Sequence, residues 1–519
     1  MYRGRPFVIL SPVPGRLFVV RSDLTRITCD AWLLPTDPWL NVTKQWLSIL
    51  PSELRHPDEF RRAAPKAFGR DRHTFAVEAS SPVAVATSIG GLSLDAILKN
   101  VREFLDLALE MRPVSTVRGR KVPLFALPLV GTGRGGWSRS KGDVVGDVVA
   151  ATSEWAAAHE ADACLVVDSA QAFAAAQSAR RQLRADRSLP PRLRPTAQAL
   201  GARAALGRLV LFVGAGVGIP AGLPDWITLL EKLADDAELR PDEQRALKKL
   251  DPLDAARIIE VRLGDNALSM ADAISPHVHA TRFALAHALL ASLPVSEVVT
   301  TNYDVLFEQA STAAGRKLAV LPYDPPYGDG WLLKLHGCIV RARGDIVLTR
   351  GDYLRYADRR AALAGIVQAL LITRTMLFVG FSLTDPNFHR IVDDVRKAVR
   401  TGGEAIRDAF GTALLLEDRP LLHELWSPDV ELLAVAKSPS SGGRTLDLFL
   451  DEMVGAASTS AEHLLDPTFA GALDEGEAAL ADALRSFEAQ LPPRAKSAPA
   501  WAVVADALSR LGRAAEHAP

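Results

Sequence analysis

The stretch that decides the fold is Leu209-Val-Leu-Phe-Val-Gly-Ala-Gly-Val-Gly-Ile-Pro-Ala-Gly-Leu-Pro-Asp-Trp226. Its first five residues are apolar and end in Gly214-Ala-Gly216, as a buried strand does before a turn. Two glycines at that point allow a sharp turn and a close approach of the backbone to a phosphate. A strict dinucleotide fingerprint would place its third glycine where Ile219 stands, and no Lys-Ser/Thr pair of a nucleoside-triphosphate loop follows. The stretch therefore predicts an α/β fold, with a turn that binds no ligand as the alternative.

Apolar runs continue this pattern along the rest of the central region. A helix-rich stretch lies between Trp226 and Leu293. Strands are predicted at Arg208–Val213, Glu297–Thr300, Gly330–Leu335, Thr375–Gly380, Thr412–Leu416 and Val430–Val435. Strands that alternate with helices indicate a Rossmann-type parallel sheet. We predict that residues 205–455 form this unit, with a helical insertion after its first strand.

The residues before this unit alternate in the same way. Strands are predicted at Leu17–Val20, Ala31–Leu34, Val83–Ala86, Pro123–Val130 and Cys164–Val167, and helices at Leu94–Met111 and Asp143–His159. We predict an α/β unit over residues 1–185, a basic, solvated and Pro-stiffened linker over 186–204, and a helical tail over 456–519. The tail either packs against its own chain or forms a contact between copies.

The composition narrows the classes of function. The chain has 519 residues, with 60 Lys and Arg against 61 Asp and Glu, so a surface built for nucleic acid or anionic lipid is disfavoured. A hydrophobic fraction of 48% excludes a mostly disordered chain. Its three cysteines, Cys29, Cys164 and Cys338, exclude a disulfide scaffold and a four-cysteine zinc site. With no segment long enough to span a bilayer, we predict a cytoplasmic protein without a membrane or nucleic-acid partner.

The glycine stretch resembles the NAD-binding loop of the sirtuin superfamily. That family places Gly-(Ile/Leu)-Pro-Asp-aromatic six residues after Gly-Ala-Gly, and here Gly214-Ala-Gly216 is followed by Gly222-Leu-Pro-Asp-Trp226. Deacylating sirtuins usually have Arg after the aromatic residue, where this chain has Ile227. The resemblance implies that NAD is bound by Gly214, Ala215, Gly216, Gly222, Pro224, Asp225 and Trp226.

Three further motifs of the same family follow in order, each after an apolar strand. They are Thr300-Thr-Asn-Tyr-Asp304, with Thr301 where the family has Gln, Lys334-Leu-His-Gly337 and Gly380-Phe-Ser-Leu383. The resemblance implies a nucleotide site lined by Thr301, Gly380 and Ser382, with His336 as the catalytic histidine.

The residue types in these motifs suit cleavage of the glycosidic bond of NAD, which breaks through a cationic ribosyl state. A histidine side chain ordinarily titrates near neutral pH, so His336 could act as a base. The Asn302 amide could orient water or ribose, and Asp304 could hold the loop or a ribose hydroxyl. A purely structural histidine at the end of a strand is the alternative for His336.

The cysteine count separates two kinds of sirtuin chemistry. Protein-deacylating members usually carry two Cys-x-x-Cys pairs that bind zinc, and only Cys338 follows His336 here. Asn302-Tyr-Asp304 and the ending Ala413-Leu-Leu-Leu-Glu417 resemble the bacterial sirtuin-like NAD hydrolases of anti-phage defence. This resemblance implies hydrolysis of NAD to nicotinamide and ADP-ribose, without zinc. A deacylase and a non-catalytic nucleotide-sensing regulator are the alternatives.

The amino-terminal unit resembles macro domains. Ser22-Asp-Leu-Thr-Arg-Ile-Thr-Cys-Asp-Ala-Trp32 is similar to their opening, and Pro128-Leu-Val-Gly-Thr-Gly-Arg-Gly-Gly-Trp137 to their diphosphate loop. The implied ligand-binding residues are Asp23, Leu24, Gly131, Thr132, Gly133, Arg134, Gly135 and Gly136. Two departures, Leu33-Leu-Pro-Thr-Asp37 and the missing glycine-rich first loop, favour binding over hydrolysis of ADP-ribose.

Two other interpretations of the predicted diphosphate loop, from Gly131 to Gly136, stay open. Gly131, Gly133 and Gly136 also fit a Gly-x-Gly-x-x-Gly dinucleotide loop, and a bare glycine turn is the simplest reading. We predict that an ADP-ribose-related ligand binds this unit and gates the NAD site. We also expect the chain to form a homo-oligomer, and a neighbouring defence protein is a further expected partner.

Overall fold

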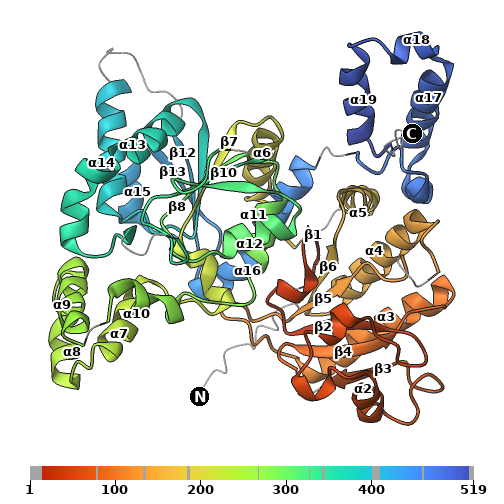
Figure 1. Cartoon of the computed structure of the whole chain (residues 1–519), viewed down its shortest axis with the longest axis horizontal. Coiled ribbons are helices and arrows are strands. Elements are labelled where there is room, and N and C mark those ends of the chain that lie inside the picture. Colours follow the sequence, from red (N-terminus) through yellow and green to blue (C-terminus); the bar gives the residue numbers. More distant parts are fainter. Residues whose placement is uncertain are drawn as a thin grey trace, which may run out of the picture.

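The computed structural model contains two α/β units and a group of carboxyl-terminal helices (Figure 1). It describes residues 14–77, 80–132, 136–183, 188–266, 268–326, 328–341, 345–399, 409–458 and 461–513. The predicted ligand-binding residues Gly133, Arg134 and Gly135 lie outside these ranges. The predicted α/β class is confirmed, whereas the predicted boundaries between units stay a prediction.

The central unit is built on a seven-stranded parallel sheet. Its strands are β7 (Leu209–Val213), β8 (Glu297–Thr300), β9 (Leu318–Leu321), β10 (Gly330–Lys334), β11 (Thr375–Val379), β12 (Gly411–Leu415) and β13 (Val430–Ala434). They lie in the order β13-β12-β11-β7-β8-β10-β9, and every paired register is parallel. This is the order of a doubly wound nucleotide-binding sheet with β9 added at one edge. The order reverses between β7 and β11, where such sheets bind their ligands.

Helices cover both faces of this sheet (Figure 1). They are η3 (Ala215–Ala221), α6 (Arg194–Ala205), α11 (Leu285–Ser292), α12 (Leu306–Ala313), α13 (Arg350–Thr373), α14 (Pro386–Val399), α15 (Pro420–Trp426) and α16 (Pro439–Ala457). The predicted helix-rich stretch also holds α7 (Trp226–Asp236), α8 (Pro241–Leu247), α9 (Pro252–Asp265) and α10 (Met270–His277). Helices α7–α10 share their own apolar core, which Tyr303, Ile339 and Leu348 of the sheet loops join.

The amino-terminal unit is built on a six-stranded sheet. Its strands are β1 (Leu17–Arg21), β2 (Ala31–Thr36), β3 (Thr74–Val77), β4 (Val83–Ser88), β5 (Leu124–Pro128) and β6 (Asp162–Val167). They lie in the order β1-β6-β5-β2-β4-β3, and only β3 runs antiparallel to its neighbour. The helices of this unit are η1 (Leu24–Arg26), α1 (Lys44–Leu47), η2 (Ser52–Leu54), α2 (Pro57–Ala63), α3 (Leu94–Met111), α4 (Lys141–Ala158) and α5 (Ala170–Gln182).

The segment predicted to be a solvated linker differs from that expectation. Its described part contains α6, and Leu189 and Leu193 ahead of the helix are fully buried. Helix α6 packs so closely on α16 that any side chain in place of Gly201 would overlap the backbone of Met453. The apolar residues between the arginines thus place this segment in the core. The many charged residues around them led to the prediction of a solvated linker.

Buried ion pairs join the amino-terminal unit to α16. Asp451 is fully buried and accepts hydrogen bonds from Arg16 at 2.5 Å and from Arg180 at 2.7 and 3.0 Å. Burial alone would raise the pKa of Asp451, but the two arginines hold it below its usual range. About two turns earlier, Arg444 of α16 forms two hydrogen bonds to Asp162, at 2.7 and 2.8 Å.

The carboxyl-terminal helices begin against the amino-terminal unit. They are η6 (Pro467–Ala472), α17 (Glu475–Gln490), α18 (Pro493–Lys496) and α19 (Trp501–Arg510). Phe469 of η6 is buried against α4, where a side chain at Gly142 would overlap it. Leu480 and Phe487 of α17 remain about half exposed. No helix in the described ranges combines the length and apolar character that a bilayer span requires.

Candidate active site

Three glycines lock two loops together where the strand order reverses. The Gly214 amide donates to the Val379 carbonyl and the Gly216 amide to the Gly380 carbonyl, both at 2.9 Å. A Cβ atom at Gly214 would lie 2.4 Å from the Gly380 oxygen, and one at Gly216 would lie 2.9 Å from the Gly380 Cα. The space that was predicted to let a phosphate approach Gly214 and Gly216 is thus occupied by the backbone of Gly380. The amides of both glycines already donate to carbonyls of the protein.

The second half of the predicted NAD loop turns into α7. Gly222 ends η3 with a φ of +92°, a conformation that favours glycine. The Asp225 carboxylate accepts the Thr228 amide at 2.8 Å and so caps the helix. Pro224 is buried and Trp226 is half-buried against the core of the insertion.

The loop after β8 is held on both sides of Asn302. The Thr300 hydroxyl donates to the Val213 carbonyl at 2.7 Å and accepts the Asn302 amide at 3.0 Å. The Asp304 carboxylate accepts the Leu306 amide at 2.9 Å, so it acts as a cap for α12. The Oδ1 atom of Asn302 is buried and forms no hydrogen bond within the described part of the chain. A buried amide oxygen without a partner is costly, so it is available to a ligand.

A buried lysine fixes the same loop from below. Lys334, the last residue of β10, is fully buried, and its ammonium contacts the Asp304 carbonyl and the Glu308 carboxylate. Burial would lower the pKa of Lys334, but the acidic groups around it, Glu308 foremost, together outweigh burial and hold this pKa above its usual range. The charge therefore persists and ties β10 to the Asn302 loop. Sequence reasoning gave Lys334 no role, because both partners are distant in the chain.

His336 lies two residues beyond β10, at the same edge of the sheet. It is 4% exposed, and its ring meets those of Tyr353 and Tyr356 edge-on, with centroids 5.6 and 6.1 Å apart. Its Nε2 atom lies 3.5 Å from an Asp385 oxygen and forms no hydrogen bond within the described residues. Burial lowers the pKa of His336, Asp385 partly offsets that, and Arg360 adds to the lowering. The imidazole is therefore neutral at pH 7.

Asp385 is the site residue that the sequence motifs missed. Its carboxylate accepts the Tyr353 hydroxyl at 2.8 Å and the Phe388 amide at 2.9 Å, besides facing His336. An Asp directly before Pro386 at a helix start is a capping signal that could have drawn attention to it. The signal does not say that the second carboxylate oxygen reaches a histidine.

Strand register brings the four loops to one edge. Val213 pairs with Thr300 and Val379, and Thr300 pairs with Lys334. Gly214, Thr301, Leu335 and Gly380 therefore begin four neighbouring loops. The Ser382 hydroxyl is exposed and lies 2.7 Å from the Thr384 hydroxyl, while Thr301 is half-buried.

The predicted ligand-binding residues of the amino-terminal unit lie in η1 and in the loop after β5. Asp23 caps η1 by accepting the Thr25 amide at 2.9 Å, and Leu24 is buried. Gly131 has a φ of +79° and Gly136 one of +103°. The Trp137 amide donates to the Gly131 carbonyl at 3.1 Å and closes the loop. The Thr132 hydroxyl donates back to the Leu129 carbonyl at 3.4 Å.

A doubly wound parallel sheet with glycine turns where its strand order reverses is an arrangement at which α/β proteins commonly bind nucleotides. Residues 296–424 match the family described as SIR2-like domain, which confirms the predicted sirtuin resemblance. The match contains the Asn302 and His336 motifs and the Gly380 turn.

Similar curated proteins carry names that fit this family. An Enterococcus faecium protein named NAD(+) hydrolase ThsA is 31% identical over 201 residues, covering 37% of this chain and 41% of that protein. A Bacillus cereus protein of the same name is 30% identical, covering 36% and 40%. A Bacillus subtilis protein named defense-associated sirtuin 2 is 28% identical, covering 37% and 19%. The chain thus spans less than half the length of these relatives.

Among solved structures, two Oceanobacillus iheyensis macrodomains, with MES and with ADP, each have a TM-score of 0.27. They are 12% and 13% identical, and cover 33% of this chain and 94% and 93% of those chains.

Replacing Gly380 tests the lock at the edge of the sheet. Gly380 has a φ of +65°, and a Cβ there would lie 2.6 Å from the Val217 nitrogen, whereas nothing lies within 4 Å of a Cβ at Gly222. We expect Gly222→Ala to cost only backbone strain, about 1–2 kcal/mol, and Gly380→Ala to lose about 1–3 kcal/mol more by overlap. Thermal unfolding of both variants measures the difference. Equal midpoints would show that the loops are not locked by contact.

Proposed function

We propose that the central unit hydrolyses NAD to nicotinamide and ADP-ribose, and that this depletes NAD in defence against phage. One observation carries the proposal. The Oδ1 atom of Asn302 and the Nε2 atom of His336 are both buried, have no hydrogen-bond partner among the residues that the structure describes, and follow adjacent strands at one edge of the sheet. The match to the SIR2-like family and the names of the similar proteins support the same activity.

The proposed roles follow from the protonation states and contacts. Neutral His336 can accept a proton from water or a ribose hydroxyl that approaches its Nε2 atom. Asn302 can orient that water or the ribose through its free oxygen. Asp304 then serves to hold the loop, since its carboxylate caps α12. Burial around the histidine limits stray water during cleavage.

The rest of the predicted NAD site belongs to the same proposal. The turns from Gly214 to Trp226 and from Gly380 to Ser382 border the edge where NAD would lie. Because the Gly214 and Gly216 amides are bonded to the β11 loop, the phosphates need other donors. In this proposal NAD is the substrate, and three cysteines leave no four-cysteine zinc site. In the described ranges, no three His, Cys, Asp or Glu residues form a group suited to a metal ion.

The amino-terminal unit is proposed to bind an ADP-ribose-related ligand that gates this site. The segment after Asp23 pairs with the central unit, because the Phe283 amide donates to the Arg26 carbonyl at 2.8 Å and the Thr28 amide to the Phe283 carbonyl at 2.9 Å. Phe283 directly precedes α11, which leads into β8 and the Asn302 loop. A ligand that shifts η1 therefore has a short backbone route to the site.

Contacts between copies and with a neighbouring defence protein complete the proposal. The half-exposed Leu480 and Phe487 on α17 and the 74% exposed Val503 on α19 favour the tail as a contact between copies. Light scattering on the full chain measures this assembly.

Removing either unpartnered group tests the activity. We expect His336→Ala to slow nicotinamide release by about 10²–10⁴-fold, as loss of a general base does, and Asn302→Ala to slow it less. His423→Ala, at an exposed histidine on α15, is the control and should match wild type. The assay follows free nicotinamide, with an acetyl-lysine peptide added in parallel. Release that depends on the peptide would favour the deacylase alternative, and equal release by all variants would refute the proposed roles.

The pH dependence tests the state of His336. Because its pKa is lowered from 6.5, the basic form and the activity should persist as pH falls below that value. Asp385 raises this pKa, so Asp385→Asn should move the acidic limb of the kcat/KM profile to lower pH and also slow the reaction. Tyr353→Phe keeps the carboxylate and should leave the limb in place. A limb that moves to higher pH in Asp385→Asn would contradict this electrostatic assignment.

Calorimetry on the full chain tests the amino-terminal site. ADP-ribose should bind to His336→Ala protein, and Asp23→Ala should weaken that binding while it keeps the fold. Asp58→Ala, an exposed carboxylate on α2, serves as the control. Unchanged binding in Asp23→Ala would remove the site from η1.

A further inference from the structure

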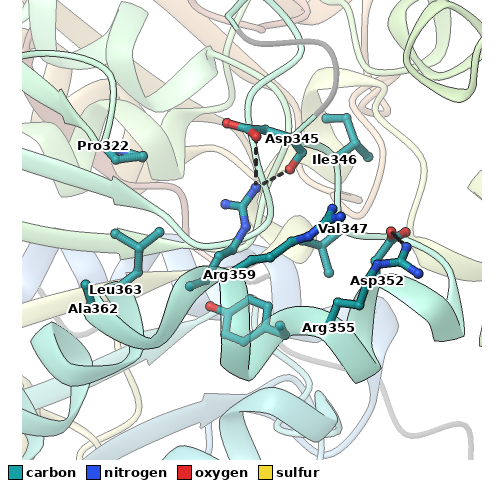
Figure 2. Close-up of a pocket in the computed structure, with 11 residues that line it drawn as sticks. Pro322, Asp345, Ile346, Val347, Asp352, Arg355, Arg359, Ala362 and Leu363 are labelled. Atoms are coloured by element: carbon teal, nitrogen blue, oxygen red, sulfur yellow. Dashed lines mark hydrogen bonds and ion pairs between the residues drawn. The ribbon is translucent and has the colours of Figure 1, made fainter.

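A small cavity lies between the segment before α13 and the first half of that helix (Figure 2). It measures about 240 Å³ and is lined by Pro322, Asp345, Ile346, Val347, Asp352, Arg355, Tyr356, Arg359, Arg360, Ala362 and Leu363. Most of these residues come from the segment before α13 and from the first half of that helix. None of them belongs to the loops that the proposed function assigns to NAD, so the cavity is a separate space.

The charge in this cavity is positive. Three guanidinium groups face two carboxylates, which leaves one net positive charge. Asp352 is already engaged, because it accepts the Leu348 and Thr349 amides and an Arg355 nitrogen at 3.0 Å. Arg360 is likewise engaged, since it donates to the Leu335 and Asp345 carbonyls.

Arg359 and Tyr356 are the two donors left over. Arg359 is exposed and has no hydrogen bond or ion pair with any residue in the described ranges. Tyr356 is 4% exposed, and its buried hydroxyl has no partner in the same ranges. A free guanidinium and an unpaired buried hydroxyl that line one cavity form a donor set for an oxyanion.

We propose that this cavity is a binding site for a phosphate-sized oxyanion, held chiefly by Arg359 with Tyr356 as a further donor. The volume fits this class, because pockets for drug-sized ligands measure about 300–1,000 Å³ and this one is smaller. The occupant is a free phosphate or the terminal phosphate of a nucleotide. A whole dinucleotide would not fit.

The site is coupled to His336 through shared residues. Tyr356 and Arg360 line the cavity and also face the histidine, together with Tyr353 of α13 and Asp385 ahead of α14. An anion beside Arg360 offsets the positive charge that lowers the pKa of His336. Occupancy should therefore move the acidic limb of NAD cleavage to higher pH, a consequence that rests on the proposed function.

The test measures anion binding directly on the full chain. Sulfate, inorganic phosphate and AMP are titrated by calorimetry at constant ionic strength. We expect wild type to bind phosphate and Arg359→Ala to bind it about tenfold or more weakly, since a charge-assisted bidentate contact is lost. Arg359→Lys should fall between them, because it keeps the charge and loses the fork. Arg245→Ala, at an exposed arginine on α8, is the matched control and should bind as wild type does.

Each result decides the proposal. Phosphate binding that depends on Arg359 supports a free anion, and Arg359-dependent binding of AMP that is tighter than phosphate supports a nucleotide phosphate. Absence of heat with all three anions, or equal affinity in wild type and Arg359→Ala, overturns the site. The readout needs no NAD cleavage. A chain that binds phosphate through Arg359 but releases no nicotinamide would refute the proposed function and keep this site.

Discussion

The contact of two glycine turns where the strand order reverses is the constraint on which the rest of the site depends. Gly214 and Gly216 lie so close to Gly380 that no side chain fits at any of the three positions. This contact joins the loop after β7 to the loop after β11 and fixes where both loops start. The Thr300 hydroxyl extends the same arrangement to the next strand by bonding to the Val213 carbonyl. Glycine at these positions is thus a packing requirement before it is a ligand-binding device.

Burial gives the polar groups around this lock their character. His336 is neutral because it is removed from water, and Lys334 stays charged because Glu308 lies beside it. Asp385 holds a middle position, since it caps α14, accepts the Tyr353 hydroxyl and faces the histidine. Neighbouring groups at one sheet edge thus reach different charge states through burial and through their partners.

The sequence predicts much of the fold and part of the site. Buried parallel strands are continuous apolar runs, so β7, β8 and β10–β13 lie within one or two residues of their expected places. The short strands β3 and β9, each at one edge of its sheet, were not predicted. The motifs locate Asn302 and His336, but they do not reveal Asp385 facing the histidine or Lys334 beneath the loop. Those relations are set by tertiary contacts. The arginine run before α6 misleads for the opposite reason, since buried Leu189 and Leu193 carry less weight in a sequence than the charges around them.

The ion pairs along α16 have a consequence for the amino-terminal unit on its own. Asp451 and Asp447 of that helix form ion pairs with Arg16, Arg180 and Arg120, and Arg120 also pairs with Asp162. A fragment cut before α16 would present these arginines to solvent as a basic patch. Such a patch attracts polyanions without regard to sequence. The isolated fragment would therefore adhere to nucleic acid. The full chain would not, because α16 pairs with these arginines.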